Sequence, residues 1–178
     1  SDRDLLMMEN GTEILFSDGI VSKIESGGTL TSEWEGSGET QMVDARGMAI
    51  IPAFVDSHSH MVWAGDRSNE ITMRAEGLDY SEISNLGGGI RKTVSQTRDA
   101  TRDKLSDLFV QRLRSAKTLG TGRIECKSGY GLDVSNEIRA LEVMGISNPP
   151  ISIDRTWLGA HDIPNGVSLS LIHISEPT

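Results

Sequence analysis

Two histidines separated by a single residue, His58 and His60, stand at the end of a short apolar run. Side chains alternate between the two faces of a strand, so both imidazoles are expected to point the same way, with Ser57 and Ser59 opposite. Imidazole nitrogens bind zinc and related divalent ions, and the pair therefore predicts two ligands of one metal. Asp56 is expected on the same face, behind the ligands. The alternative is an accidental pair with both rings in solvent at the strand end.

The segments that follow the pair predict the elements that position it. The spacing of apolar residues predicts a helix over 101–119, with Thr101 as its N-cap and Gly120 just beyond its end. A strand over 123–127, a second helix over about 135–144 and a strand over 151–158 come next. The inward residues of the second helix are expected to be Ile138, Leu141 and Met144. Helices that alternate with strands are typical of a parallel sheet covered by helices.

The first fifty residues have a different character. Two short strands are predicted over 12–16 and 20–25, around a Ser-Asp-Gly turn that is typical of a hairpin. An exposed loop is expected over 26–41, and strand-like sequence returns over 41–51. We therefore predict a small β domain over 1–51, a second domain portion over 52–166, and a tail over 167–178 that continues neither pattern.

Composition narrows the class of partner. The 178 residues contain 17 Lys and Arg against 26 Asp and Glu, a formal charge of −9, which argues against a nucleic-acid partner and favours a small molecule. No apolar run approaches the roughly 20 residues that cross a bilayer, and no signal peptide is visible, so we expect no membrane partner and a cytoplasmic protein. The single cysteine, Cys126, suits a reducing compartment and is expected to pack in the core rather than act as a nucleophile.

Several motifs occur together with the histidine pair. They are the runs PAFVDSHSH (52–60), AGDRSNE (64–70), GGGI (87–90), KSGYGL (127–132) and LGAH (158–161). In this order and at this spacing, over about residues 40–164, they resemble the imidazolonepropionase family of the amidohydrolase superfamily. The resemblance implies an α/β fold, a TIM-like (β/α)8 metal-dependent hydrolase barrel of which only the first strands are present, with a small N-terminal β domain.

The resemblance also implies a reaction and residue roles. Members of the family hydrolyse the cyclic amide of 4-imidazolone-5-propanoate to N-formimidoyl-L-glutamate in L-histidine degradation, with one divalent metal, zinc or iron. His58 and His60 match the first two metal ligands. Arg67 matches the residue that holds the substrate propionate, and Tyr130 and His161 match two further substrate-binding residues. No residue is assigned as the catalytic base.

The match is incomplete in ways that bear on function. Later metal ligands of the family, a histidine and an aspartate, have no counterpart here, and His173 lies in the unmatched tail. We therefore expect a truncated reading frame that folds poorly and has little activity by itself, with a homodimer only at full length. Lys127 is expected to be structural rather than a carboxylated bridge between two metals.

Two other functions remain open from the sequence. One is another amidohydrolase that acts on a heterocyclic amide or amine, against which Arg67 and Tyr130 argue. The other is a non-catalytic metal-binding module that uses only His58 and His60.

Overall fold

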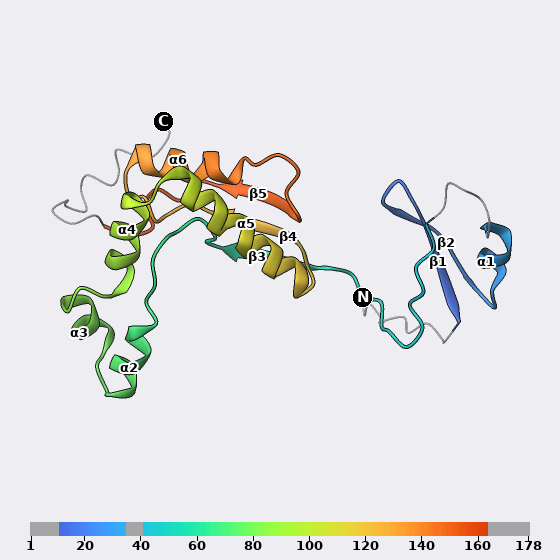
Figure 1. Cartoon of the computed structure of the whole chain (residues 1–178), viewed down its shortest axis with the longest axis horizontal. Helices are drawn as coiled ribbons and strands as arrows, with labels where there is room; N and C mark the ends of the chain where they lie inside the picture. Colours follow the sequence, from blue (N-terminus) through green and yellow to red (C-terminus); the bar gives the residue numbers. More distant parts are fainter. Residues whose placement is uncertain (1–10, 35–40, 164–178) are drawn as a thin grey trace, which may run out of the picture. The chain divides into compact units, whose positions relative to one another are not determined.

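The structure is a computed structural model that describes residues 11–34 and 41–163, and the chain forms two compact units, Ser1–Pro52 and Ala53–Thr178 (Figure 1). Each unit is described by itself. The expected tail over 167–178, His173 included, lies outside the described residues. Among the residues described, no helix has the length and apolar character needed to span a bilayer.

The first unit is built on an antiparallel hairpin of β1 (Thr12–Ser17) and β2 (Ile20–Ser26). The turn residues Asp18 and Gly19 both have positive φ, 51° and 77°, as the predicted Asp-Gly hairpin turn requires. The predicted strands are therefore confirmed.

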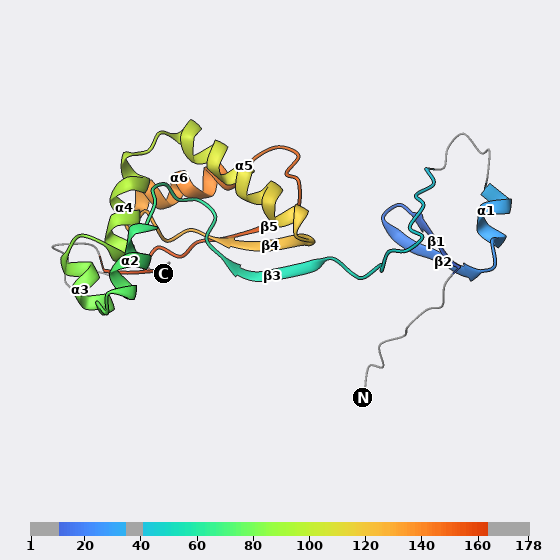
Figure 2. The same ribbon diagram turned by 60° about the horizontal axis from the view of Figure 1, so that its bottom comes forward.

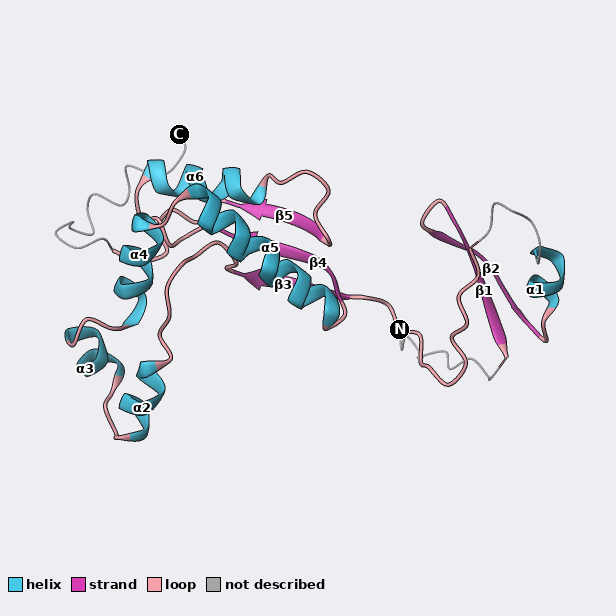
Figure 3. Ribbon diagram, viewed as in Figure 1, coloured by secondary structure: helices cyan, strands magenta, loops and turns pink. Residues whose placement is uncertain are grey.

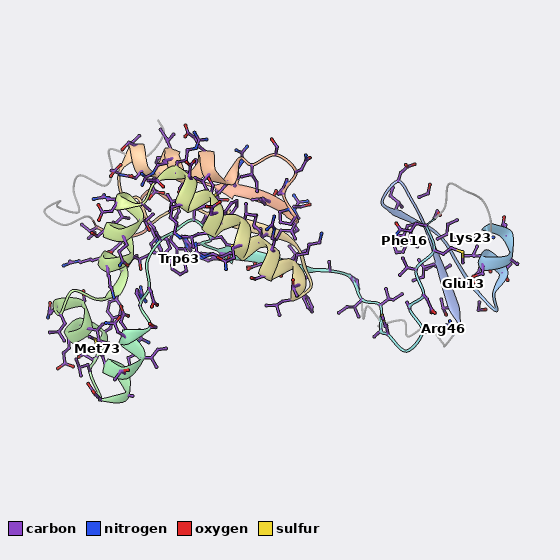
Figure 4. All side chains as sticks on the ribbon, viewed as in Figure 1. Glu13, Phe16, Lys23, Arg46, Trp63 and Met73 are labelled. Atoms are coloured by element: carbon purple, nitrogen blue, oxygen red, sulfur yellow. The ribbon has the colours of Figure 1, made fainter. Side chains whose placement is uncertain are left out.

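Two expectations for the first unit were wrong. The segment expected to be a loop contains a short helix, α1 (Thr29–Trp34), because the Glu13 carboxylate of β1 accepts hydrogen bonds from the backbone N–H groups of Leu30 and Thr31 at 2.8 and 3.1 Å (Figure 4). The strand-like stretch over 41–51 forms no strand. Its β-forming residues have no neighbouring strand to take up their backbone hydrogen bonds within the described part of the chain, and a strand needs that pairing.

The second unit contains a parallel three-stranded sheet in the order β3-β4-β5, formed by Phe54–Ser59, Thr121–Lys127 and Ser152–Thr156. The predicted helices are present as α5 (Arg102–Thr118) and α6 (Val134–Met144). Thr101 caps α5 by accepting from the backbone N–H of Lys104 at 3.2 Å. These strands, their parallel pairing and both helices confirm the pattern read from the sequence.

Helices α5 and α6 cover one face of this sheet, and the described part of the chain places no helix on the other face (Figure 2). Between β3 and α5 lie three further helices, α2 (Asn69–Ala75), α3 (Tyr80–Asn85) and α4 (Gly89–Asp99), which the sequence analysis did not resolve individually (Figure 3).

The core lies between the sheet and its two covering helices. Its fully or almost fully buried side chains come from α5, β4 and α6: Leu105, Phe109, Leu113, Ile124, Cys126, Val143 and Met144. The prediction that Ile138 points inward was wrong, since its side chain is 46% exposed. The inward position next to it is taken by Glu137, which is fully buried.

The face of the sheet that α5 and α6 leave uncovered carries charged residues. Arg123 of β4 donates from Nε and Nη2 to the two carboxylate oxygens of Asp154 on β5, at 2.6 and 2.7 Å. Lys127 pairs with Glu125, which also accepts from the Thr156 hydroxyl at 2.7 Å. These two hydrogen bonds to its side chain lower the pKa of Glu125. The Arg123–Asp154 ion pair and the Thr156–Glu125 hydrogen bond thus join β4 to β5 across this face, whereas the Lys127–Glu125 pair lies within β4.

The buried aromatic ring of Phe109 provides a test of this packing. We expect Phe109→Ala to lower the free energy of unfolding by about 3–5 kcal/mol, because the substitution leaves a cavity beneath β4. Leu119→Ala, just beyond the end of α5 and 78% exposed, is the matched control and should change it by less than about 1 kcal/mol. Urea denaturation measures both, and equal effects would contradict this assignment of the core.

Candidate functional site

The candidate residues gather at the carboxyl ends of the three parallel strands. His60 follows β3 directly, Tyr130 lies three residues beyond β4, and His161 lies five residues beyond β5. The carboxyl ends of neighbouring parallel strands meet at one edge of a sheet, which is where ligands bind in open and closed α/β folds. Three loops distant in sequence therefore converge there.

The strand that carries the two histidines departs from strict alternation. The register of β3 against β4 shifts between Asp56 and Ser59, and the Asp56 carboxylate accepts a hydrogen bond from the backbone N–H of His58 at 3.1 Å. The strand accommodates an extra residue at this point, so its side chains do not alternate regularly between the two faces. The expectation that Asp56 lies on the same face as the two histidines therefore cannot be based on regular strand geometry. The rings of His58 and His60 nevertheless lie 5.4 Å apart, centroid to centroid.

Four aromatic rings form one cluster. His60 stacks on His161 with centroids 4.4 Å apart and ring planes within 8° of parallel. The ring of Tyr130 meets both of them edge-on, at 5.4 Å from His60 and 5.5 Å from His161. Four of the five residues singled out from the sequence, namely His58, His60, Tyr130 and His161, are thus brought together.

The imidazole of His60 is the least satisfied group in the cluster. Its Nδ1 and Nε2 are both buried, and neither has a partner with full hydrogen-bond geometry among the described residues, although the Ser128 backbone lies near enough to raise the pKa of the ring. A buried polar atom without a partner is costly, and such atoms often mark a missing ligand. Burial is the main cause that lowers the pKa of His60, and the neighbouring His161 and His58 lower it further. A lower pKa favours the neutral ring, which is the form that binds metals.

The side chains of the cluster provide only part of the ligand set that a metal ion needs. No group of three or more His, Cys, Asp or Glu side chains is arranged to hold a metal within residues 11–34 and 41–163. Two neighbouring imidazoles, one with both nitrogens unpaired, nevertheless fit the first two ligands of a site that needs three or four. A complete site would therefore take its other ligands from outside the described residues.

His161 is held in one orientation by the loop after β4. Its Nδ1 lies 3.0 Å from the carbonyl oxygen of Gly129. A carbonyl oxygen can only accept, so Nδ1 carries the proton and Nε2 is the nitrogen left to meet a ligand. Gly129 has a φ of +125°, and an added Cβ there would lie 2.8 Å from His161 Nδ1, so this close approach requires glycine.

The loop that carries Tyr130 is shaped by a buried carboxylate that the sequence analysis missed. Glu137, in the first turn of α6, accepts three backbone N–H groups at 2.7–2.8 Å, from Gly129, Gly131 and Leu132. The sequence feature that could have revealed this role is a glutamate one helical turn beyond a glycine-rich loop. Acidic residues favour helix N-termini and can accept hydrogen bonds from exposed backbone N–H groups.

The loop after β3 is fixed by Arg112 of α5, also missed. Its Nη1 donates to the carbonyl oxygens of Met61 and Trp63, both at 2.7 Å, and its guanidinium carbon lies 3.7 Å from the centroid of a Trp63 ring (Figure 4). Burial lowers the pKa of Arg112. The Trp63 indole N–H in turn donates to the His60 carbonyl at 3.0 Å, which ties this clamp to the histidine strand.

Arg67 is the one predicted residue that the structure does not bring to the ring cluster. Its Nε lies 3.3 Å from Oε1 of Glu70, and Glu70 also accepts from the backbone N–H of Gly89 at 2.7 Å. The GGGI motif thus has a local role, since it presents the first N–H of α4 to a buried carboxylate. Within the described residues, Glu70 is the acidic side chain that pairs with Arg67, and the pair is formed through Nε.

Comparisons with curated proteins find imidazolonepropionases. The chain is 36% identical over 167 residues to a probable imidazolonepropionase of Danio rerio, and 37% identical over 166 residues to that of Homo sapiens. These alignments cover 93% and 92% of the chain and 39% of each relative. An imidazolonepropionase of Colwellia psychrerythraea is 42% identical over 128 residues, 71% of this chain and 31% of its own. Over nearly its whole length, the chain is similar to imidazolonepropionases.

The chain matches only part of each relative, and this limits which functional properties of the relatives can be assigned to the chain. The chain spans about 39% of the length of the curated relatives from Danio rerio and Homo sapiens. No family model matches the chain. The resemblance read from five short motifs is therefore confirmed by whole-sequence comparison, whereas the roles of individual site residues stay predictions.

Cys126 gives a test that separates packing from reactivity. Its side chain is fully buried, and burial raises the pKa of the thiol from 9.0 to about 11. At pH 8 this difference leaves about 100-fold less thiolate than in the unfolded chain, so we expect slow reaction with a disulfide reagent in the folded protein and fast reaction in denaturant. Equal rates would show that Cys126 is exposed, and a faster rate in the folded protein would show that it is activated.

The buried carboxylate of Glu70 gives a second test. Glu70→Gln should lower the free energy of unfolding by about 2 kcal/mol, because it weakens the bonds to Arg67 and to the Gly89 N–H. The exposed Glu76, just after α2, supplies a matched control in Glu76→Gln, for which we expect almost no change. Thermal denaturation, with amide exchange at Gly89, measures both. Unchanged protection at Gly89 would rule out the proposed link.

Proposed function

We propose that the protein to which this chain belongs hydrolyses the cyclic amide of 4-imidazolone-5-propanoate to N-formimidoyl-L-glutamate, a step of L-histidine degradation. The observation that carries the proposal is the ring cluster. At the carboxyl edge of a parallel sheet, the His60 ring meets Tyr130 and His161, and the His58 ring lies beside that of His60. Similarity to curated imidazolonepropionases over 92–93% of the chain supports the same reading.

We further infer that β3, β4 and β5 begin a (β/α)8 barrel. In such a barrel each strand is followed by a helix that packs on the outside, and active sites form at the carboxyl ends of the strands. The parallel order β3-β4-β5 and the covering of one face by α5 and α6 support this inference. The charged face of the sheet would then line the barrel interior.

His58 and His60 are the residues that would hold one divalent ion, zinc or iron. Such an ion, when bound, lowers the pKa of water toward neutrality and polarises a carbonyl, which is the chemistry that amide hydrolysis needs. His58 lies in β3 and His60 follows it directly, and the buried nitrogens of His60 have no partner with full hydrogen-bond geometry among the described residues. The remaining ligands and the general base lie outside the described residues.

The other residues of the site would bind and orient the substrate. The Tyr130 hydroxyl and His161 Nε2 can form hydrogen bonds with the polar edge of the imidazolone ring. Arg67 would hold the propionate through its Nη atoms, while Glu70 keeps the guanidinium in place through Nε. The substrate is a small molecule, and we infer a cytoplasmic enzyme.

Turnover by a full-length protein tests the proposal. We would continue this chain after Ile163 with the remaining C-terminal part of the Danio rerio relative, and we call this the completed protein. We expect metal-dependent hydrolysis of 4-imidazolone-5-propanoate, with loss of at least 100-fold in kcat/KM and of stoichiometric metal in His58→Ala.

Two outcomes would count against the proposal. Metal binding without turnover of this substrate, but with turnover of another heterocyclic amide or amine, would assign a different amidohydrolase. Stoichiometric metal without hydrolysis of any such compound would assign a non-catalytic metal-binding module.

A further inference from the structure

The carboxylate of Glu137 lies outside the ring cluster and binds the loop that carries Tyr130. It is fully buried, although a charged side chain is costly to bury unless it is well paired. No basic side chain forms a salt bridge with it in the described part of the chain. Its partners are instead three backbone N–H groups of a single loop. A buried charge compensated in this way fixes the path of that loop.

The two carboxylate oxygens of Glu137 accept hydrogen bonds from different residues of the loop. Oε1 accepts from the backbone N–H groups of Gly131 and Leu132, at 2.8 and 2.7 Å, and Oε2 accepts from that of Gly129 at 2.7 Å. The loop is therefore held on both sides of Tyr130. Leu132 has a positive φ of 53°, which is unfavourable for a leucine and needs such support.

The same loop holds His161. The Gly129 residue that donates its N–H to Glu137 uses its carbonyl oxygen to accept from His161 Nδ1 at 3.0 Å. Gly129 thus links the Glu137 carboxylate to the His161 ring, and its carbonyl oxygen favours the His161 tautomer that is protonated at Nδ1. Ser128 adds a second connection between the loops, since its N–H donates to Thr156 at 3.0 Å and its hydroxyl accepts from the Leu158 N–H at 3.0 Å.

We propose that Glu137 is a positioning residue of the site. Its carboxylate fixes the loop over 128–132, which places the Tyr130 ring and sets His161 with Nδ1 protonated and Nε2 directed to a ligand. The inference rests on the proposed function for its effect on turnover, but its structural part stands on the hydrogen bonds alone.

The test uses Glu137→Gln in the completed protein. Glutamine has the same shape but replaces one carboxylate oxygen with an NH2 group, which cannot accept from a backbone N–H. At least one side of the loop is therefore released. The matched control is Glu142→Gln, on the exposed face of the same helix, where the lost partner is Arg102 at 3.6 Å.

Three readouts are taken for each protein. Hydrogen exchange of the amides over 128–132 reports the loop, and the 15N shifts of the His161 ring report its tautomer. Steady-state kinetics are normalised to bound metal, so that a smaller folded fraction does not mimic a slower enzyme. For Glu137→Gln we expect at least 10-fold faster exchange, a mixture of His161 tautomers, and a kcat/KM lower by roughly 10–100-fold, since small misplacements in a site have effects of that size.

A second variant leaves Glu137 in place. Gly129→Ala puts a methyl group 2.8 Å from His161 Nδ1, so it should disturb the tautomer of His161 while the Gly131 and Leu132 amides stay protected. Glu137→Asp keeps the charge and should restore part of the exchange protection and of kcat/KM. Gly129→Ala and Glu137→Asp keep the proposal testable if Glu137→Gln fails to fold.

The outcomes separate the two claims. If the completed protein does not hydrolyse the substrate, the proposed function fails, while exchange and 15N shifts still test Glu137. If Glu137→Gln leaves exchange and the His161 tautomer unchanged, the positioning role is overturned. It is also overturned if the loop is released while metal-normalised kcat and KM match those of Glu142→Gln, because Glu137 would then be only structural.

Discussion

Parallel pairing of three strands is the constraint on which the site depends. The pairing of β4 with both β3 and β5 brings three carboxyl ends to one edge, so that residues about 100 positions apart in sequence, such as His60 and His161, stack at 4.4 Å. The pairing itself rests on the buried contacts of α5 with β4 and of α6 with β5, in a core where Phe109 and Ile124 are fully buried. The burial of apolar side chains on one face of the sheet thus positions the polar residues of the site at the carboxyl edge of its strands.

The loops at that edge are ordered by charged side chains that bind backbone groups. Glu137 accepts three N–H groups of the Tyr130 loop, Glu70 accepts the first N–H of α4, and Arg112 donates to two carbonyls of the loop after β3. Loops cannot satisfy their own buried backbone groups as helices and sheets do, and a charged partner forms stronger bonds than a neutral one. Charge-assisted hydrogen bonds therefore hold the loops next to the histidines.

Much of this arrangement could be predicted from periodicity and spacing. The hairpin at Asp18, the cap at Thr101 and the strands of the parallel sheet follow from local rules that act over a few residues. The roles of Glu137 and Arg112 could not, because their partners are backbone atoms whose positions depend on the tertiary fold. The prediction that Ile138 points inward was wrong for the same reason, since the buried position is taken by the Glu137 carboxylate that binds the loop.

Anomalous diffraction at the metal edge, from crystals of the completed protein, would locate the metal directly. We expect one peak within about 2.1 Å of a ring nitrogen of both His58 and His60, with the Tyr130 and His161 rings beside it. A metal bound elsewhere, or held by neither histidine, would contradict the assignment of this strand edge as the active site.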